Sequence, residues 1–350
     1  MADTLSWPAL IAQLLSGTDL SISEATWAMN QVMEGEVTEA QLAGFLVALN
    51  AKGETVDEIV GFRDAILDHA LPLDVDPFAL DIVGTGGDRF GTVNVSTMAS
   101  VVAAASGVPV IKHGNKAASS LSGSSDVLRA LGVDLDLEPE RVAAVLEEAG
   151  ISFAFASKFH PGFKNAGAVR AQLGVPTVFN YLGPRCIPAR AEASAVGVAH
   201  LDRVPRIVGV FQTRGATALV FRGDDGLDEL TTTGHSHIWE VSRGSVKEHD
   251  LNPRDLGIPI ARIEQLKGGD AEFNADVVRR VMAGEQGPVR DMVVLNTAAG
   301  LAAYRLAFDP TQVDRPLLER LDEQMTVARA TLDSGAASRK LDQWIAATQR

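Results

Sequence analysis

A cluster of glycines, hydroxyl side chains and one lysine within residues 81–126 has the composition of a phosphate-binding site. Gly84, Gly86 and Gly87 follow an apolar run at 80–83, and Lys112 follows a second apolar run at 108–111. Glycines let backbone N–H groups come close to a phosphate, and the lysine adds a full positive charge. The stretch therefore favours binding of a polyanion.

Two predicted strand-to-helix switches lie within this stretch. After the first strand, Asn94, Ser96 and Thr97 open an alanine-rich helix that we expect to continue through Ala105. A helix start presents unpaired N–H groups and a partial positive charge, which both favour an anion. If the two strands lie side by side, the two turns form one cradle. The alternative is that both are ordinary tight turns of an α/β domain.

Two familiar phosphate-binding motifs do not fit this stretch. A Walker loop ends in Gly-Lys-Ser or Gly-Lys-Thr, which is absent. A dinucleotide fingerprint would require a glycine at the position of Arg89, after Gly84 and Gly86. The glycine spacing therefore assigns the stretch to neither class.

A second candidate site is the acidic segment 224–229, which follows a short predicted strand. Asp224, Asp225, Asp228 and Glu229 place four carboxylates close together. Clustered carboxylates repel one another unless they bind a cation or are fully solvated. Mg²⁺ bound together with a substrate phosphate takes one or two protein carboxylates, which the adjacent Asp228 and Glu229 would supply. The alternative is a solvated surface loop.

Three further side chains are candidates for a pocket, each with a structural alternative. His113 lies between Lys112 and Gly114, and His160 stands in a predicted turn at the end of a strand. Either histidine is a hydrogen-bonding pocket residue or a packed polar group. Arg170, on a predicted helix, either pairs with a ligand carboxylate or is a surface arginine. No catalytic triad is predicted, because no nucleophile elbow accompanies the histidines.

The first 70 residues are predicted to be helical. Apolar residues at helical spacing follow two of the capping motifs in this segment. Three capping boxes occur at even spacing: Ser21 with Glu24, Thr38 with Gln41, and Thr55 with Glu58. We expect a small helical bundle with short loops.

From residue 80 onward, short apolar runs alternate with helical segments, which predicts an α/β domain with a mainly parallel central sheet. Strands are expected at 80–83, 108–111, 151–156, 193–198, 218–221 and 238–241. Further helices are expected at 126–131, 141–150, 165–173, 204–213, 270–306 and 315–348, with a turn at 284–288. The expected domains are a helical domain of residues 1–72, with a later contribution from about 166–190, and an α/β domain of residues 73–350.

Composition narrows the classes of function. The 350 residues carry a formal net charge of −14, which argues against nucleic acid or an anionic membrane as a partner. The one cysteine, Cys186, allows no intrachain disulfide and favours a cytoplasmic location. We expect no secretory signal, and no apolar run reaches the ~20 residues of a membrane span.

Six motifs in this sequence resemble the anthranilate phosphoribosyltransferase family of tryptophan biosynthesis. They occur in the family's order over roughly residues 80–300, and the N-terminal helical segment also fits. The motifs are GTGGD at 84–88, NVST at 94–97, KHGN at 112–115, SSxSGS at 119–124, VPTVFNxLGP at 175–184 and GxDGLDELT at 223–231.

The resemblance implies a fold and a reaction. The implied fold is a small helical domain joined to a larger α/β domain of the nucleoside phosphorylase/phosphoribosyltransferase type, in a homodimer formed through the helical domain. In the implied reaction, the amine of anthranilate attacks the anomeric carbon of 5-phosphoribosyl 1-diphosphate (PRPP), with inversion and release of diphosphate. Charge develops on the diphosphate and on the ribosyl group, so stabilisation is expected to be mostly electrostatic.

The resemblance also implies roles for individual residues. PRPP is expected to contact Gly84, Gly87, Asp88, Thr92, Asn94, Val95, Ser96, Thr97, Lys112, His113, Gly114, Asn115, Lys116, Ala117, Ala118, Ser119, Ser120 and Ser124. Anthranilate is expected to contact Gly84, Asn115, Arg170, His113, His160 and Gly183. Mg²⁺, as two ions, is expected on Ser96, Asp228 and Glu229. The implied catalytic residues are Asn115, Arg170, Asp228 and Glu229.

The sequence departs from the family pattern mostly toward the acceptor side. Lys116 stands in place of an arginine, Ile187 in place of an asparagine and Ser157 in place of a proline, and Gly234 interrupts a threonine-rich run. These departures leave open a different aromatic amine or a nucleobase as acceptor for the same donor. A further alternative is a non-catalytic paralogue that binds nucleic acid, against which the net charge argues.

Overall fold

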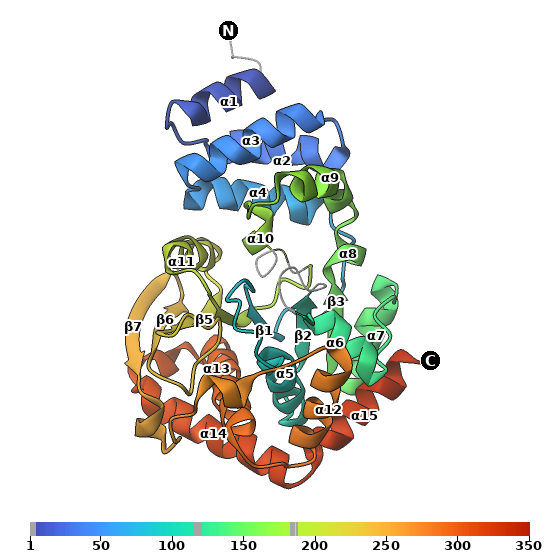
Figure 1. Ribbon diagram of the computed structural model, residues 1–350, viewed down its shortest axis with the longest axis vertical. Helices are drawn as coiled ribbons and strands as arrows, with labels where there is room; N and C mark the ends of the chain where they lie inside the picture. Colours follow the sequence, from blue (N-terminus) through green and yellow to red (C-terminus); the bar gives the residue numbers. More distant parts are fainter. Residues whose placement is uncertain (1–4, 115–120, 183–185, 187) are drawn as a thin grey trace. The chain divides into compact units, whose positions relative to one another are not determined.

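The computed structural model describes residues 5–114, 121–182, 186 and 188–350. The chain forms two compact units, Met1–Pro72 with Ala156–Pro188, and Leu73–Phe155 with Ala189–Arg350 (Figure 1). The later contribution to the helical unit was expected from about residue 166, but it begins at Ala156, directly after strand β3 has ended. The α/β unit is therefore not the continuous stretch 73–350, because the chain leaves it between β3 and the next strand.

The first unit is entirely helical in its described part. All three predicted capping boxes are present: the side chains of Ser21, Thr38 and Thr55 accept a hydrogen bond from the third helical N–H of α2, α3 and α4. Each box satisfies two N–H groups that the helix leaves unpaired. The helices are α1 (Trp7–Leu15), α2 (Ile22–Glu34), α3 (Glu39–Lys52), α4 (Val56–Asp68), α8 (Ala156–Phe159), α9 (Lys164–Leu173) and α10 (Phe179–Leu182).

The later segment of this unit is attached to the end of α2. The Nδ2 group of Asn165, in α9, donates to the carbonyl oxygens of Val32 at 3.1 Å and Met33 at 2.9 Å. These are carbonyls of the last turn, which lack the N–H partner four residues on that carbonyls in the middle of a helix have. One polar side chain thus fixes α9, which carries Arg170, onto the bundle.

The described part of the second unit contains a seven-stranded sheet of order β3-β2-β1-β4-β5-β6-β7. The first five strands in this order are parallel, and β6 and β7 are antiparallel. The strands are β1 (Leu80–Gly84), β2 (Val110–Gly114), β3 (Ile151–Phe155), β4 (Ala193–Gly197), β5 (Thr217–Gly223), β6 (Ser236–Ser242) and β7 (Ser245–Leu251). The predicted mainly parallel α/β domain is confirmed.

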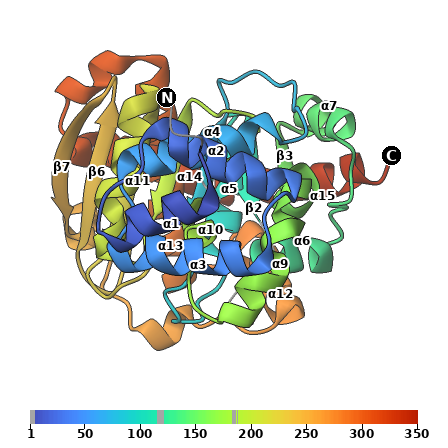
Figure 2. The ribbon, with the colours of Figure 1, turned by 90° about the horizontal axis from the view of Figure 1, so that it is seen from above.

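Strand β7 was not predicted. Figure 2 shows β6 and β7 side by side at one edge of the sheet. Most side chains of β7 are exposed and polar, so its sequence has no apolar alternation to reveal it. Charged side chains are common on edge strands, because they discourage pairing with another chain.

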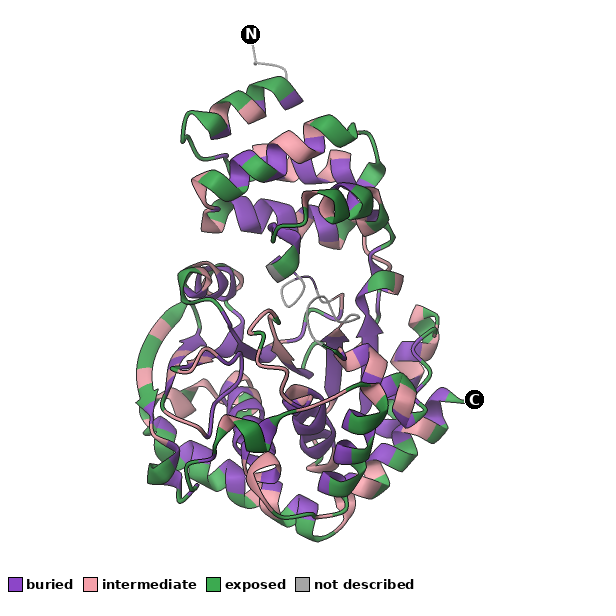
Figure 3. Ribbon diagram, viewed as in Figure 1, coloured by how far each residue is buried: buried purple, intermediate pink, exposed green. Residues whose placement is uncertain are grey.

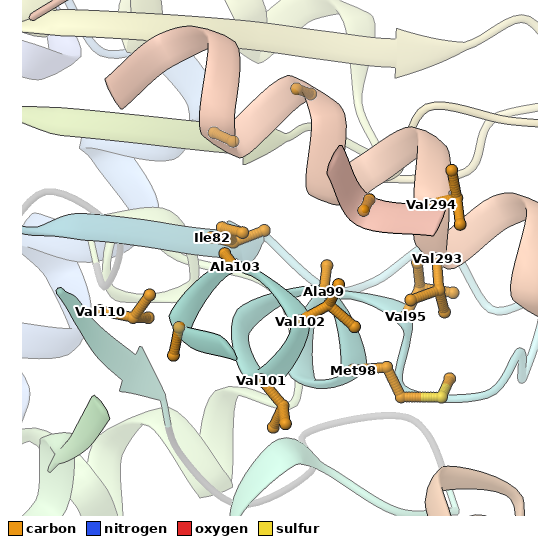
Figure 4. Packing of buried hydrophobic residues seen from close by; sticks show 14 of the residues in the cluster. Ile82, Val95, Met98, Ala99, Val101, Val102, Ala103, Val110, Val293 and Val294 are labelled. Carbon is orange, nitrogen blue, oxygen red and sulfur yellow. The ribbon is translucent and has the colours of Figure 1, made fainter. Parts of the chain in front are cut away.

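Helices pack on both faces of this sheet. Helices α5 and α13 contact the parallel strands on one face, and α11 contacts β5, β6 and β7 on the other. Figure 4 shows side chains of α5 packed near Ile82 of β1 and near Val293 and Val294 of α13, and Figure 3 shows that both helices are largely buried. The helices of this unit are α5 (Val95–Ala105), α6 (Ser124–Leu131), α7 (Pro139–Ala149), α11 (Val204–Arg214), α12 (Ala271–Met282), α13 (Pro288–Phe308), α14 (Leu317–Asp333) and α15 (Ala336–Thr348).

The strand order reverses between β1 and β4. From β1 the chain proceeds outward through β2 and β3, and then returns to place β4 and β5 on the opposite side of β1. Open parallel sheets bind ligands at such a switch point, outside the carboxyl ends of the strands. In this unit those ends are Gly84 and Gly197, which are paired in register. Within the described residues, no helix has the combined length and apolar character needed to cross a membrane.

Candidate active site

The acidic segment lies directly against the strand ends at the switch point. A Cβ atom on Gly84 would lie 2.3 Å from the Oδ2 atom of Asp228, and one on Gly197 would lie 1.7 Å from the carbonyl oxygen of Asp228. A side chain on Gly197 would collide with the backbone of Asp228, and one on Gly84 would displace the Asp228 carboxylate. The close approach of two glycines brings the carboxylates of this loop to the glycine-rich turn that follows β1.

Hydrogen bonds join the acidic segment to the predicted phosphate cradle. The backbone N–H of Gly86 donates to the Asp228 carboxylate at 2.6 Å. The N–H of Ser96, in the first turn of α5, donates to the Glu229 carboxylate at 3.3 Å. The expected Mg²⁺ ligands Ser96, Asp228 and Glu229 thus lie in one region, although they come from two segments that are far apart in the sequence.

The four carboxylates of this segment have different surroundings. Asp225 accepts hydrogen bonds from the hydroxyls of Thr231 and Thr233 and from the N–H of Leu227. Its carboxylate therefore stabilises the conformation of the loop. Asp224 is exposed to solvent. Asp228 and Glu229 are each only 8% exposed. The structure therefore separates Asp228 and Glu229 as the pair that a bound cation would contact.

Lys112 lies beneath the cradle. It is 1% exposed, and its ammonium group donates to the carbonyl oxygen of Ile82 at 2.5 Å and to the Ser96 hydroxyl at 3.2 Å. From the sequence it was expected to contribute its charge directly to a bound anion. In the described structure its ammonium group donates to protein groups instead. One of these is the hydroxyl of Ser96, which places the positive charge next to the first turn of α5.

The remaining described cradle residues are held by neighbouring segments. The side-chain oxygen of Asn94 accepts from the Nδ2 group of Asn274, in α12, at 2.9 Å. Thr92 forms an isolated β-bridge with Lys267. Ser124 is the first residue of α6, and its hydroxyl would lie 2.5 Å from a Cβ on Gly114. The ends of β1 and β2 and the starts of α5 and α6 are therefore parts of one packed region.

Other predicted cradle residues have local roles. The Asp88 carboxylate accepts from the N–H of Phe90 at 3.1 Å. Gly87 has a φ of +90°, and Thr97 and Val95 are buried in the first turn of α5. Asn115, Lys116, Ala117, Ala118, Ser119, Ser120 and Gly183 lie outside the described residues.

The two candidate acceptor residues of the helical unit lie on or before α9. The guanidinium carbon of Arg170 lies 5.2 Å from the ring centroid of Phe179, and burial lowers the pKa of this arginine. The ring of His160 is buried and stacks on Phe163 with centroids 5.0 Å apart. Burial lowers the pKa of His160 to about 4, so its ring is neutral at neutral pH.

Burial dominates the electrostatics of the acidic pair. Burial, with a smaller contribution from the charge of Asp88, raises the pKa of Asp228 to about 7. Burial and the neighbouring Asp228 raise the pKa of Glu229 well above its usual range. The described residues contain no group of three or more His, Cys, Asp or Glu side chains that would hold a metal ion alone. Two buried carboxylates without a full ligand set fit Mg²⁺ held jointly with a phosphate ligand.

Comparison with known proteins identifies the family. Residues 8–70 match the helical bundle domain, and residues 76–338 the α/β domain, of a glycosyl transferase family. The chain is 70% identical over 349 residues to the anthranilate phosphoribosyltransferase of Leifsonia xyli subsp. xyli (strain CTCB07), with 100% of each chain covered. The chain belongs to the anthranilate phosphoribosyltransferase family. The resemblance drawn from the six motifs is confirmed.

Solved anthranilate phosphoribosyltransferases share the fold of this chain. The Thermus thermophilus structure matches with a TM-score of 0.89 and 42% identity, covering 97% of this chain and 99% of that one. The Saccharomyces cerevisiae structure in complex with PRPP and Mg matches with a TM-score of 0.88 and 26% identity, covering 98% of each. The yeast protein has also been solved with 4-fluoroanthranilate, with a TM-score of 0.85, 25% identity and 99% of each chain covered.

Sequence reasoning missed a residue that holds the acidic pair in this member of the anthranilate phosphoribosyltransferase family. Asn296, fully buried in α13, accepts from the N–H of Leu230 and donates to the Leu230 carbonyl, both at 2.9 Å. The side-chain amide thus bonds to both backbone groups of Leu230, the residue that follows Glu229, as a neighbouring strand would do. The available signal was a single amide within the apolar run VVLNTAAGL.

The raised pKa of Asp228 predicts how pH changes stability. Between pH 4 and 7 the carboxyl is ionised in the unfolded chain but protonated in the folded one. The stability it contributes is therefore complete at low pH and is lost as the pH rises to about 7. Without Mg²⁺, we expect the free energy of unfolding of the wild type to fall by roughly a few kcal/mol between pH 4.5 and 8, relative to that of Asp228→Asn over the same range. Denaturant unfolding of both proteins measures this, and parallel pH profiles would contradict it.

Proposed function

We propose that the chain transfers the phosphoribosyl group of PRPP to the amine of anthranilate, giving N-(5-phosphoribosyl)anthranilate and diphosphate in tryptophan biosynthesis. The observation that carries this proposal is the meeting of a glycine-rich cradle with buried Asp228 and Glu229 at one topological switch point. The yeast relative solved with PRPP and Mg supports the donor, and the complex with 4-fluoroanthranilate supports the acceptor.

The proposed donor half uses backbone dipoles, hydroxyls and a metal. Ser96, Asp228 and Glu229 would hold Mg²⁺, for which we propose two ions. When bound, the metal neutralises charge on the diphosphate as it leaves. The start of α5 would direct the positive end of its helix dipole toward the phosphates. Lys112 supports this turn from below, through the hydroxyl of Ser96.

The proposed acceptor contacts combine a charged side chain with neutral polar groups. Arg170 pairs with the anthranilate carboxylate, and Asn115 orients the amine. Gly84, His113, His160 and Gly183 complete the acceptor contacts. His160 acts as a neutral ring, because burial keeps its pKa at about 4. An aromatic amine attacks without a strong base, so positioning and electrostatic stabilisation carry the reaction.

We further propose that the chain acts as a cytoplasmic homodimer joined through its helical domain. Large apolar side chains of the helical unit are exposed, among them Leu15 at 72% and Val47 at 48%. A dimer formed through this unit would cover such side chains. A monomeric mass by light scattering at micromolar concentration would refute the dimer.

The turnover assay tests the proposed function. Loss of anthranilate fluorescence is expected when PRPP and Mg²⁺ are both present, and no loss when either is omitted. Unchanged fluorescence with a folded protein and both substrates would refute anthranilate as the acceptor. A screen of aromatic amines and nucleobases by diphosphate release then tests the alternative acceptors that Lys116, Ser157 and Ile187 leave open.

A further inference from the structure

Strands β1 and β2 separate toward the ends that carry the cradle. Strand β1 pairs with β4 over five residues, from Leu80 to Gly84, and β2 pairs with β3 over five residues, from Val110 to Gly114. Between β1 and β2, by contrast, the described register consists of the single pair Leu80 and Val110. Buried backbone groups beyond this pair need other partners, since unpaired ones are costly.

Two buried side chains supply partners across the opening between these strands. Asp81 of β1 accepts a hydrogen bond through Oδ1 from the backbone N–H of His113 in β2, at 3.3 Å. Lys112 of β2 donates from Nζ to the backbone carbonyl of Ile82 in β1, at 2.5 Å. Each side chain therefore bonds to the backbone of the opposite strand. Both residues are 1% exposed, so no water replaces these bonds at low cost.

This reciprocal arrangement determines where the end of β2 lies. His113 and Gly114 follow Lys112 directly and end the strand, close to the hydroxyl of Ser124. With the strands spread, the Lys112 ammonium also reaches the hydroxyl of Ser96, 3.2 Å away. A regular ladder would pair these backbones directly and leave no place for the two side chains between them.

We propose that Asp81 is a positioning residue for the donor substrate. Its side chain keeps β1 and β2 apart, and so places Lys112 beneath Ser96 and His113 at the end of β2. Asp81 itself contacts neither the acidic pair nor any bound molecule in this scheme. The inference rests on the proposed function for the identity of the donor, and it deepens that function by adding a residue that acts through Lys112 and His113.

The test compares two substitutions of Asp81. Asp81→Asn keeps the Oδ1 acceptor for His113, so the dissociation constant of PRPP with Mg²⁺ should stay within about threefold of wild type. Asp81→Leu removes the acceptor at similar size and should raise that constant by about tenfold or more. Isothermal titration without anthranilate measures both values, so the outcome is independent of turnover. An Asp81→Leu protein that binds PRPP like wild type would overturn the proposal, as would an equal loss in both variants.

A matched control separates positioning from a general loss of stability. Glu240 of β6 is also a buried strand carboxylate, and its Oε1 atom lies 2.7 Å from the Arg320 guanidinium. Glu240→Leu should lower the melting temperature without changing PRPP binding. If Glu240→Leu weakens PRPP binding as much as Asp81→Leu, the effect is one of stability and the proposal is wrong.

A double-mutant cycle covers the case in which Asp81→Leu alone does not fold. In a Lys112→Met background, Asp81→Leu no longer leaves a buried ammonium group beside the lost carboxyl group, so this background preserves folding better. Asp81→Leu should therefore weaken PRPP binding by less than about threefold in a Lys112→Met background, because the two residues act together. A loss of tenfold or more on adding Asp81→Leu to that background would overturn the proposal. Failure of the anthranilate assay alone would refute the proposed acceptor and leave these binding results standing.

Discussion

Replacing Glu229 by glutamine is expected to lower kcat/KM for PRPP about a thousandfold while the folded protein becomes no less stable. Glutamine keeps the shape of the side chain and an oxygen that accepts from the N–H of Ser96. It removes the negative charge that would hold Mg²⁺. Because this carboxylate is buried and its pKa is raised by burial and by Asp228, removing the charge also removes a desolvation cost.

The control for this substitution lies in the same loop. Asp224 is exposed to solvent, and Asp224→Asn should change kcat/KM by less than about twofold. Steady-state kinetics at several Mg²⁺ concentrations, with thermal unfolding of each variant, measure both effects. A Glu229→Gln enzyme with wild-type activity would show that this carboxylate does not support the metal. A large loss in Asp224→Asn would show that the loop as a whole is sensitive to charge.

The sequence predicted best those features that depend on local pattern. The capping boxes at Ser21, Thr38 and Thr55 formed as expected, because each involves only one helix turn. The strand-to-helix turns after β1 and β2 could also be predicted, because an apolar run, glycines and a helix start occur in immediate succession. The two turns lie in one region only if β1 and β2 are neighbours in the sheet, and the strand order shows that they are.

Features that depend on contacts between distant segments could not be predicted in the same way. Sequence reasoning singled out Asp228 and Glu229 among the four carboxylates of segment 224–229, but it could not show that Asp225 holds the loop together or that Asp228 packs against Gly84. Lys112 looked like a residue that reaches a ligand, but the opening between β1 and β2 directs it to Ile82 and Ser96. Strand β7 exists because β6 pairs with it along its length, although its own residues show no buried face.

Replacing Arg170 by alanine is expected to raise the KM for anthranilate about a hundredfold and the KM for PRPP less than threefold. No described carboxylate forms an ion pair with this guanidinium, which lies against the ring of Phe179. Burial lowers its pKa, but an arginine remains charged at neutral pH. A partly buried cation with no counter-ion among the described residues favours a ligand carboxylate, because the ligand then supplies the opposite charge.

Two further variants distinguish this role from packing. Arg170→Lys keeps the charge but loses the planar fork, so its KM for anthranilate should rise about tenfold, between wild type and alanine. Arg129 also lies over an aromatic ring, that of Phe155, but is paired with Asp136. Arg129→Ala should therefore leave the KM for anthranilate unchanged. A lost contact to a carboxylate affects only the substrate that carries the carboxylate. If Arg170→Ala raised both KM values equally, we would conclude that the arginine supports the fold of α9 and does not bind the acceptor.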